Sequence, residues 1–394
     1  MKRHHLTPLR TLILSVWLGL AGCKTPQATA PSMAPLPAEA FVKQWQADVG
    51  NARDPITQLH VREGALIAYT HNNNSFWLSA SGGQLLAINQ VAAPGHTIQP
   101  PVSLADRVVI PTTATVEIFD KSGKHIDSLK SPRVLESPAA GAGESFFIAV
   151  AYPGSGRLAK VDLGKDKASL DWELYTSAGI VAAPAVVGDS VFCAGMDGKV
   201  TAVTFTRQPL WPLPDNVFRT GGPVTADVAA DDSGVYVASQ DSKLYCLDRA
   251  IGKIHWIYYA GTPLTDQPLI LGNMILQLVP YEGLVAINKT EGAYSRQPMW
   301  RQPVAEQVLA ADDKFLYVRN GSTIIALDKA SGEPRFRSDR ADLSVFATNL
   351  TTPMIYAATH SGTILGIRPV LKPGTVGEMV FNEQVIAEPV AMAK

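Results

Sequence analysis

The chain has 394 residues, a formal charge of −1 and a hydrophobic share of 46%. A nearly neutral chain without a stripe of Lys and Arg is not typical of proteins that bind nucleic acid. Its length is sufficient to bury a substantial core, and its three cysteines show no spacing typical of a metal site.

Residues 1–22 have the pattern of a secretory signal peptide. They begin with basic residues, and the apolar run Leu12–Leu20 is too short to span a bilayer as a helix. The run ends in a Leu-Ala-Gly sequence before Cys23, which resembles the bacterial lipobox. This resemblance implies cleavage before Cys23 and lipidation of its thiol. The alternative is an ordinary cleaved signal with an incidental cysteine.

Residues 23–40 are rich in Pro, Ala, Thr and Ser, which predicts a flexible tether between the lipid anchor and the folded domain. Lys24 follows the predicted lipidated cysteine. In the lipoprotein sorting systems of some bacteria, Asp at this position retains the protein in the inner membrane. The resemblance to such lipoproteins therefore implies an anchor in the outer membrane, with the protein facing the periplasm.

Between residues 41 and 370 a short apolar segment recurs eight times. Its copies are centred on Ala87, Ile118, Lys160, Ala202, Cys246, Ala286, Ala326 and Gly366. The first interval is 31 residues, whereas the later ones are 40 to 44. Short strands at a period of about 40 are the signature of a β-propeller. We therefore predict an all-β fold, an eight-bladed propeller of four-stranded antiparallel blades.

A recurring aromatic residue stands on the last strand of successive repeats. The series comprises Trp45, Trp172, Trp211, Trp256, Trp300 and Phe336. A ring repeated once per blade favours packing between neighbouring blades, because it serves every blade alike. A stacking site for a ligand is the alternative. No such Trp strand is evident in the first two repeats, which are the most degenerate.

The eighth repeat lacks a last strand of its own, and either end of the chain could supply one. Residues Phe41–Val49 contain Trp45 and read as a strand, so we predict that this N-terminal strand closes the ring and removes an exposed edge. The rival is the segment Met379–Ile386 in the C-terminal tail, residues 371–394, which also reads as a strand.

The search for chemistry yields no catalytic residues. The six histidines after the predicted signal peptide stand singly, without the spacing of a metal site. The pairs Asp231-Asp232 and Asp312-Asp313 are acidic, but they fall at turn positions and lack the further acidic ligands of a calcium loop. We predict no metal site. Cys193 and Cys246 are expected to be buried free thiols, with a disulfide between them as the alternative.

The segments Pro184–Val203 and Leu247–Trp256 resemble the PQQ-type propeller repeat, which occurs in quinoprotein dehydrogenases and in many proteins that bind no quinone. Together with the lipobox and tether, they resemble the BamB family, the lipoproteins of the outer-membrane β-barrel assembly machinery. That family contacts its barrel partner through a loop after the third blade. The corresponding segment here, Trp172–Ala182, is shorter and has no Arg, so no partner-binding residue is carried over.

The resemblance implies a monomeric, non-enzymatic scaffold that binds an envelope protein and takes no cofactor. A quinone-dependent dehydrogenase is one alternative, but the chain has neither adjacent cysteines nor a set of acidic ligands, so we expect no PQQ. A glycan- or peptidoglycan-binding module is another. Its motivation is the aromatic pair Phe76-Trp77, although these residues alternate like the core of a strand.

Overall fold

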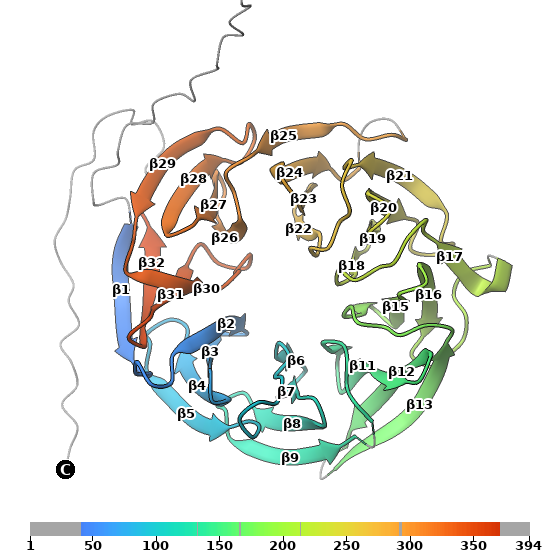
Figure 1. The fold of residues 1–394 in the computed structure, drawn as a ribbon, viewed down its shortest axis with the longest axis horizontal. Coiled ribbons are helices and arrows are strands. Elements are labelled where there is room, and N and C mark those ends of the chain that lie inside the picture. Colours follow the sequence, from blue (N-terminus) through green and yellow to red (C-terminus); the bar gives the residue numbers. More distant parts are fainter. Residues whose placement is uncertain (1–40, 132, 165–166, 213, 291–293, 371–394) are drawn as a thin grey trace, which may run out of the picture. The chain divides into compact units, whose positions relative to one another are not determined.

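The computed structural model describes residues 41–131, 133–164, 167–212, 214–290 and 294–370. These residues form eight four-stranded antiparallel sheets, which are arranged as blades around a central opening (Figure 1). The prediction of an all-β, eight-bladed propeller is therefore confirmed. Among the described residues, no helix is long and apolar enough to cross a membrane. The predicted signal peptide, Cys23, the tether and the tail lie outside the described residues.

Each blade runs from an innermost strand near the central opening to an outermost strand at the rim (Figure 1). Blades 1 and 2 comprise β2 (Ile56–Arg62), β3 (Ala65–Thr70), β4 (Asn74–Ser79) and β5 (Leu85–Gln90), then β6 (Val102–Ser103), β7 (Arg107–Pro111), β8 (Thr115–Asp120) and β9 (His125–Lys130). Blades 3 and 4 comprise β10 (Ala140–Ala142), β11 (Ser145–Tyr152), β12 (Ser155–Leu163) and β13 (Ala168–Thr176), then β14 (Ala185–Val187), β15 (Ser190–Ala194), β16 (Lys199–Thr204) and β17 (Val217–Arg219), preceded by the 3-10 helix η1 (Pro214–Asn216).

The second half of the ring repeats this order. Blades 5 and 6 comprise β18 (Ala229–Asp231), β19 (Gly234–Ser239), β20 (Lys243–Leu247) and β21 (Ile254–Tyr259), then β22 (Leu269–Leu271), β23 (Met274–Val279), β24 (Gly283–Asn288) and β25 (Pro298–Gln302). Blades 7 and 8 comprise β26 (Gln307–Ala311), β27 (Phe315–Asn320), β28 (Thr323–Asp328) and β29 (Pro334–Asp339), then β30 (Leu343–Phe346), β31 (Ile355–Thr359), β32 (Thr363–Pro369) and β1 (Phe41–Asp48).

Strand β1 closes the ring, as predicted. It pairs antiparallel with β32, from Phe41 opposite Pro369 to Asp48 opposite Thr363. The junction is tight, because a Cβ atom on Gly362 would lie 2.3 Å from the backbone of Gly50. The chain therefore joins its two ends within one sheet, which leaves blade 8 without a gap.

The hydrophobic core is divided among the interfaces between blades. The buried apolar residues of the described chain form eight clusters, and each cluster combines side chains from two successive blades, including blades 8 and 1. This arrangement explains why the strands are apolar on both faces: each blade packs against a neighbour on either side. Ring closure therefore completes two of these interfaces, one on each side of blade 8.

One prediction about the repeat is wrong. The first recurring segment, centred on Ala87, was expected to be equivalent to the other seven, but it belongs to the outermost strand β5. The equivalent third strand of blade 1 is β4, where Trp77 pairs with Ala87 just as Ile118 of blade 2 pairs with Asp127. The short first interval came from this shift. The third strand of each repeat was identified by its apolar residues, and the outermost strand was expected to be more polar. Because Leu85–Ile88 is apolar, this outermost strand was mistaken for a third strand.

The recurring aromatic residues occupy one equivalent place, which we call the inter-blade position. All of them except Trp211 are on outermost strands, and in several blades the aromatic residue lies opposite the residue before a β-bulge of the third strand, as Trp256 does opposite Cys246. Trp211 lies in the connection between β16 and β17. The indole N–H of each Trp donates to a backbone carbonyl in the next blade. These bonds join Trp45 to Ala80, Trp172 to Phe205, Trp211 to Arg249, Trp256 to Lys289 and Trp300 to Lys329, at 2.8 to 3.1 Å.

Turn glycines make room for these rings. A Cβ atom on Gly252 or Gly332 would lie 2.4 Å from the ring of Trp211 or Trp300, respectively, and both glycines have a φ of +70°. Phe336, which has no N–H, holds the inter-blade position of blade 7. There the adjoining strands β32 and β1 come from opposite ends of the chain, so no turn connects them and none offers a carbonyl.

Blades 1 and 2 fill the inter-blade position differently. In blade 1 it holds Ala87, and the ring of Trp77 from β4 packs there instead, against the turn at Gly123 and 5.3 Å from the ring of Phe119. In blade 2 it holds Asp127, whose carboxylate accepts the N–H of Ala168 in blade 3 at 3.3 Å. Trp77 is fully buried, so it offers no exposed surface to a glycan.

We expect that an indole ring at position 87 can replace the ring of Trp77 between blades 1 and 2. Trp77→Ala should lower the free energy of unfolding by about 3–5 kcal/mol, and Ala87→Trp alone should cost about 1–3 kcal/mol by overpacking. The double variant should lose less than the sum, because the new indole can enter the space that Trp77 left. Urea unfolding of the four chains measures this coupling, and additive losses would show that the two residues do not share one space.

Candidate functional site

In the pairs Asp231-Asp232 and Asp312-Asp313, which were considered as calcium ligands, the first carboxylate accepts hydrogen bonds from the backbone of its own turn. The Oδ1 atom of Asp231 accepts the backbone N–H of Ser233 at 2.8 Å, and its Oδ2 atom binds Lys289 at 2.7 Å. Asp312 accepts the N–H groups of Lys314 and Phe315 in the same way. Within the described ranges, no three His, Cys, Asp or Glu residues are grouped so that they could hold a metal ion.

The two cysteines that the structure describes are free and buried. Cys193 lies in the core cluster between blades 3 and 4, whereas Cys246 lies in the cluster between blades 5 and 6. Because they belong to different interfaces, they have no route to a common disulfide. Burial raises the pKa of Cys193 to about 12, so its thiol stays protonated at neutral pH and is a poor nucleophile.

A cleft of about 270 Å³ opens between blades 3 and 4. Its floor includes the buried side chains of Ile180 and Cys193, and its walls carry charged groups from blade 4. Lys199 and Asp197 form an ion pair at 3.1 Å. Arg219 and Asp215 form another at 3.0 Å. We call this hollow the blade 3–4 cleft.

The charged wall of the cleft is held in place by local hydrogen bonds. Ser177, from the loop after blade 3, donates to Asp197 at 2.6 Å, and Lys199 donates to Ser177. Burial would raise the pKa of Asp197, but the hydrogen bonds from Ser177 and Lys199 outweigh it and lower the pKa below its usual value. The carboxylate is therefore charged at neutral pH, and the cleft presents fixed charges of both signs.

A second, apolar hollow of about 110 Å³ lies between blades 2 and 3. Its lining includes Leu129, Ile148, Val161 and the exposed Leu170. We call it the blade 2–3 pocket. Since one hollow lies on each side of blade 3, both adjoin the outermost strand β13.

Strand β13 connects the two hollows. Leu170 and Glu173 line the blade 2–3 pocket, and Tyr175 lines the blade 3–4 cleft. Leu170 is 54% exposed and Tyr175 is 65% exposed, although both are large and apolar in body. We call β13 together with the two hollows the blade 3 surface. Exposed apolar side chains beside hollows with charged rims are typical of protein-binding sites.

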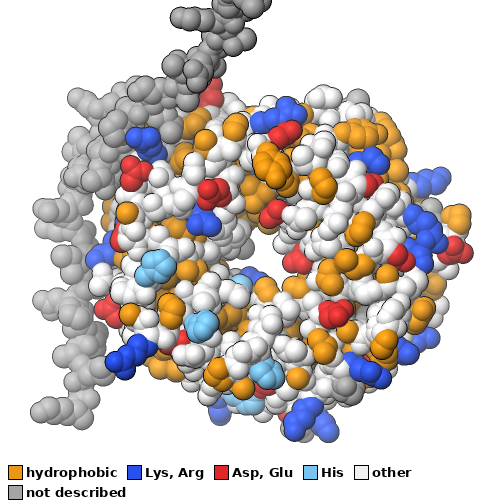
Figure 2. Space-filling view, viewed as in Figure 1, with side chains coloured by type: hydrophobic (Ala, Val, Ile, Leu, Met, Phe, Trp, Pro, Cys, Tyr) orange, Lys and Arg blue, Asp and Glu red, His pale blue; other side chains and the backbone are white. Residues whose placement is uncertain are grey.

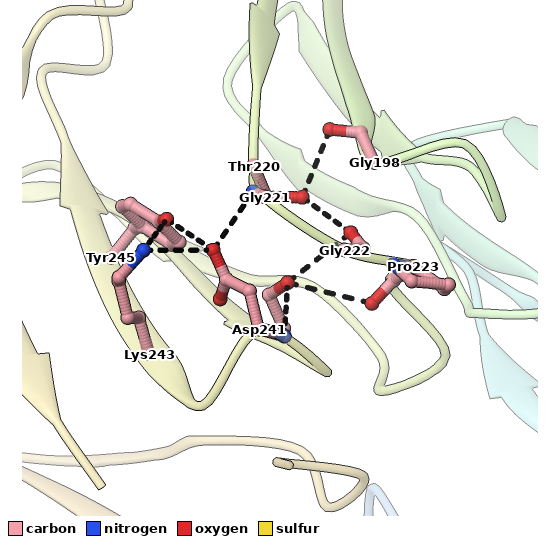
Figure 3. A network of polar contacts seen from close by, with 9 residues as sticks. Gly198, Thr220, Gly221, Gly222, Pro223, Asp241, Lys243 and Tyr245 are labelled. Atoms are coloured by element: carbon pink, nitrogen blue, oxygen red, sulfur yellow. Dashed lines mark hydrogen bonds and ion pairs between the residues drawn. The ribbon is translucent and has the colours of Figure 1, made fainter. Parts of the chain in front are cut away.

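A polar network joins blades 4 and 5 where the chain passes from one to the other (Figure 3). Asp241 accepts hydrogen bonds from the N–H of Gly221 at 2.8 Å, from the hydroxyl of Tyr245 at 2.5 Å and from Lys243 at 3.2 Å. Thr220 donates to the carbonyl of Gly222 at 2.6 Å. The network fixes the connection between the blades, so its role is structural.

The charge of Asp241 makes this network sensitive to acid. Burial would raise its pKa, but the bonds from Tyr245, Gly221 and Lys243 outweigh burial and lower the pKa below its usual value. The folded state therefore binds this proton more weakly than the unfolded chain. The carboxylate contributes stability above its unfolded pKa of about 4, and this contribution is lost as the pH falls through the folded pKa.

We expect Asp241→Asn to be less stable than the parent chain at pH 7, with a difference that narrows as the pH falls below about 4. The reason is that acid removes from the parent chain the same charge that the substitution removes. Urea unfolding midpoints of both chains between pH 7 and pH 3 measure the effect. A difference that stays constant over this range would show that the charge does not stabilise the fold.

Charges of both signs are interspersed on the face of the ring shown in Figure 2, which also shows the opening at the centre. No block of Lys and Arg gathers on that face. The view therefore agrees with the near-neutral composition and does not favour a surface for nucleic acid.

Comparison with known proteins supports this architecture. Residues 206–295 match the family model described as outer membrane protein assembly factor BamB, of the PQQ-like repeat type. BamB from Moraxella catarrhalis has a similar structure, with a TM-score of 0.64 and 15% identity, covering 86% of this chain and 99% of that one. No curated protein matches the sequence.

Proteins with other roles share the fold. The computationally designed protein Ika8 has a TM-score of 0.64 at 14% identity, covering 83% of this chain and 99% of that one. The C-terminal WD40 domain of Sif2 has a TM-score of 0.62 at 11% identity, covering 84% of this chain and 100% of that one. At such identities the likeness shows the fold alone. The repeat match adds a likeness of residues 206–295 to the PQQ-like repeat of BamB, on a chain whose fold is a β-propeller.

Proposed function

We propose that the protein is a non-enzymatic scaffold that a lipid on Cys23 anchors to the bacterial outer membrane, facing the periplasm. In this proposal it binds a protein partner of the outer-membrane β-barrel assembly machinery through the blade 3 surface. The observation that carries the proposal is the pair of hollows beside the exposed side chains of Leu170 and Tyr175. The BamB-like repeat supports the class of partner, and the lipobox supports the anchor.

The position of the blade 3 surface, next to the loop after the third blade, favours it as the partner-binding site over the other blades. In the BamB family, which the chain resembles, a loop after the third blade contacts the partner, and four residues of the corresponding segment here, Tyr175, Thr176, Ser177 and Ile180, line the blade 3–4 cleft. This location supports the proposal. The segment has no arginine of its own, but Lys199 and Arg219 of blade 4 also line the cleft, where they are paired with Asp197 and Asp215. A rigid ring that holds two hollows in fixed positions loses little entropy when a partner binds.

The test is affinity purification of the tagged, lipidated protein from its own envelope in mild detergent, followed by mass spectrometry and an absorbance spectrum. We expect a barrel-assembly protein in stoichiometric amount and no chromophore. The double variant Leu170→Ala, Tyr175→Ala should reduce recovery at least tenfold, because exposed anchors of this kind contribute most of the binding energy.

The matched control is Tyr281→Ala, which removes a tyrosine that is 100% exposed on a turn of blade 6. This variant should recover the partner as the parent chain does. If the double variant and Tyr281→Ala recovered equal amounts of the partner, the partner would not bind through Leu170 and Tyr175. A protein that is recovered alone would contradict the scaffold role, and a quinone-like absorbance would contradict the non-enzymatic one.

A further inference from the structure

Strand β5 is an unusually apolar edge. It is the outermost strand of blade 1 and pairs only with β4. Leu85, Leu86 and Ile88 on this strand are 50%, 47% and 56% exposed. Leu86 is the extra residue of a β-bulge, because Leu85 pairs with Leu78 and Ala87 pairs with Trp77. The three exposed apolar side chains lie together on the outermost strand of the blade, beside its free edge.

The other outermost strands of the ring carry Asp, Glu, Lys or Arg, except β21, whose one titratable group besides its tyrosines is His255. For example, β29 contains Arg335, Arg337 and Asp339, and β1 contains Lys43 and Asp48. Charged side chains protect an edge strand from pairing with other chains. Strand β5 reads Leu-Leu-Ala-Ile-Asn-Gln and has no charged residue. Its free edge offers both unpaired main-chain groups and apolar side chains, which are the two components of recognition by strand addition.

The rest of the chain contains a segment suited to this edge. Met379–Ile386 reads as a strand with apolar residues at both of its ends, and it was the rival candidate for the closing position of blade 8. Strand β1 occupies that position, with its full length paired to β32. The segment therefore needs another edge if it is to pair as a strand.

The exit of the chain lies close to the start of β5. Pro369, near the last described residue, pairs with Phe41 of β1. Farther along β1, Trp45 donates to the carbonyl of Ala80, and its ring packs on Gly83, just before β5. Along a strand, Phe41 and Trp45 are about 13 Å apart. Residues 371–378 can span up to about 26 Å, which is enough to cross β1 and reach β5.

We propose that Met379–Ile386 adds to β5 as a fifth strand of blade 1. Its main chain would pair with the free edge, and its apolar residues would cover Leu85, Leu86 and Ile88. The tail would then bridge blades 8 and 1 on the outside, at the same junction that β1 closes from within.

The test places a photoreactive benzoylphenylalanine at position 86 of the full-length chain. We expect an intrachain cross-link from β5 to a peptide within residues 371–394, in a product with the mass of a monomer. The matched control carries the same residue at position 259, because Tyr259 is 54% exposed, similar to Leu86 at 47%, on β21, the outermost strand of blade 5. The control should give no cross-link to the tail.

Three outcomes would overturn the proposal: no cross-link from position 86, a cross-link to a second copy of the chain, or a cross-link to another protein. A second measurement does not depend on the inserted residue. Hydrogen exchange of the amides in Leu85–Gln90 should be at least tenfold faster in a chain that ends at Val370 than in the full-length chain, whereas exchange in β21 should not change. Equal exchange of β5 in both chains would contradict the added strand.

Discussion

A chain that begins at Gly50 should lose its cooperative unfolding transition and should aggregate, because blade 8 would lack its outermost strand. The expected loss includes Trp45, whose ring packs against Gly83 of blade 1 and Gly366 of blade 8. A buried Trp alone contributes about 3–5 kcal/mol. The main-chain bonds of β1 to β32 are lost with it. Since a native domain is stable by only about 5–15 kcal/mol, this loss is comparable to the whole stability.

Urea unfolding followed by circular dichroism, together with size-exclusion chromatography, measures the effect. The control is a chain that begins at Ala38, which lacks the predicted anchor and most of the tether but keeps β1. This control should unfold cooperatively as a monomer. If the chain from Gly50 were equally stable, the open edge of β32 would have found another strand, and further truncation at Val370 would show whether Met379–Ile386 supplies it.

The second large effect is expected at Trp300. Trp300→Ala should lower the free energy of unfolding by about 3–5 kcal/mol. The substitution empties the inter-blade position between blades 6 and 7, where the ring covers Gly332, and it removes the hydrogen bond to Lys329. The neighbouring blades cannot close the space without bending a sheet, so the cavity is expected to persist.

The matched control is Met299→Ala, one residue earlier on the same strand. Met299 is exposed, so its truncation should change the free energy of unfolding by no more than about 0.5 kcal/mol. Guanidinium unfolding of the two variants and the parent chain separates burial from strand propensity. Similar losses in both variants would mean that the strand, and not the indole in its inter-blade position, carries the stability.

The blade 3 surface and the edge of β5 use different properties of the same fold. The blade 3 surface relies on hollows between rigid blades, where loops and outer strands meet. The edge of β5 relies on a single strand with unpaired main-chain groups. The proposals are therefore independent: loss of partner binding through Leu170 and Tyr175 would not bear on the cross-link from position 86.

Much of the fold could be predicted from local pattern. The interval of about 40 residues and the single aromatic residue in each later repeat are both features of one blade, so they were visible without any contact between distant residues. The closing strand was predicted because Trp45 repeats the pattern of Trp256 and Trp300. In each case an apolar residue at a fixed place in the repeat carried the information.

The first blade could not be assigned in this way. Its outermost strand β5 is more apolar than usual, whereas its third strand β4 carries the Trp, so the alternation of apolar residues pointed to the wrong strand. Only the pairing of Trp77 with Ala87 shows which strand is which. No pattern in the sequence connects Trp77 with Ala87. The two side chains share one space because both lie against Gly123 of the next blade.

The repeat and the number of blades follow from the local pattern of the sequence, which also carries a segment that resembles a lipobox. The pattern favoured β1 over the tail segment as the closing strand, and the pairing of β1 with β32 settled that choice. The places where binding surfaces could form became visible only once the blades were packed against one another. The blade 3–4 cleft joins Tyr175 to Arg219, and the blade 2–3 pocket joins Leu129 to Leu170. These pairs come from different blades, and hollows form where two rigid sheets fail to fill the space between them. That misfit depends on the angle between blades, which no local pattern of residues encodes.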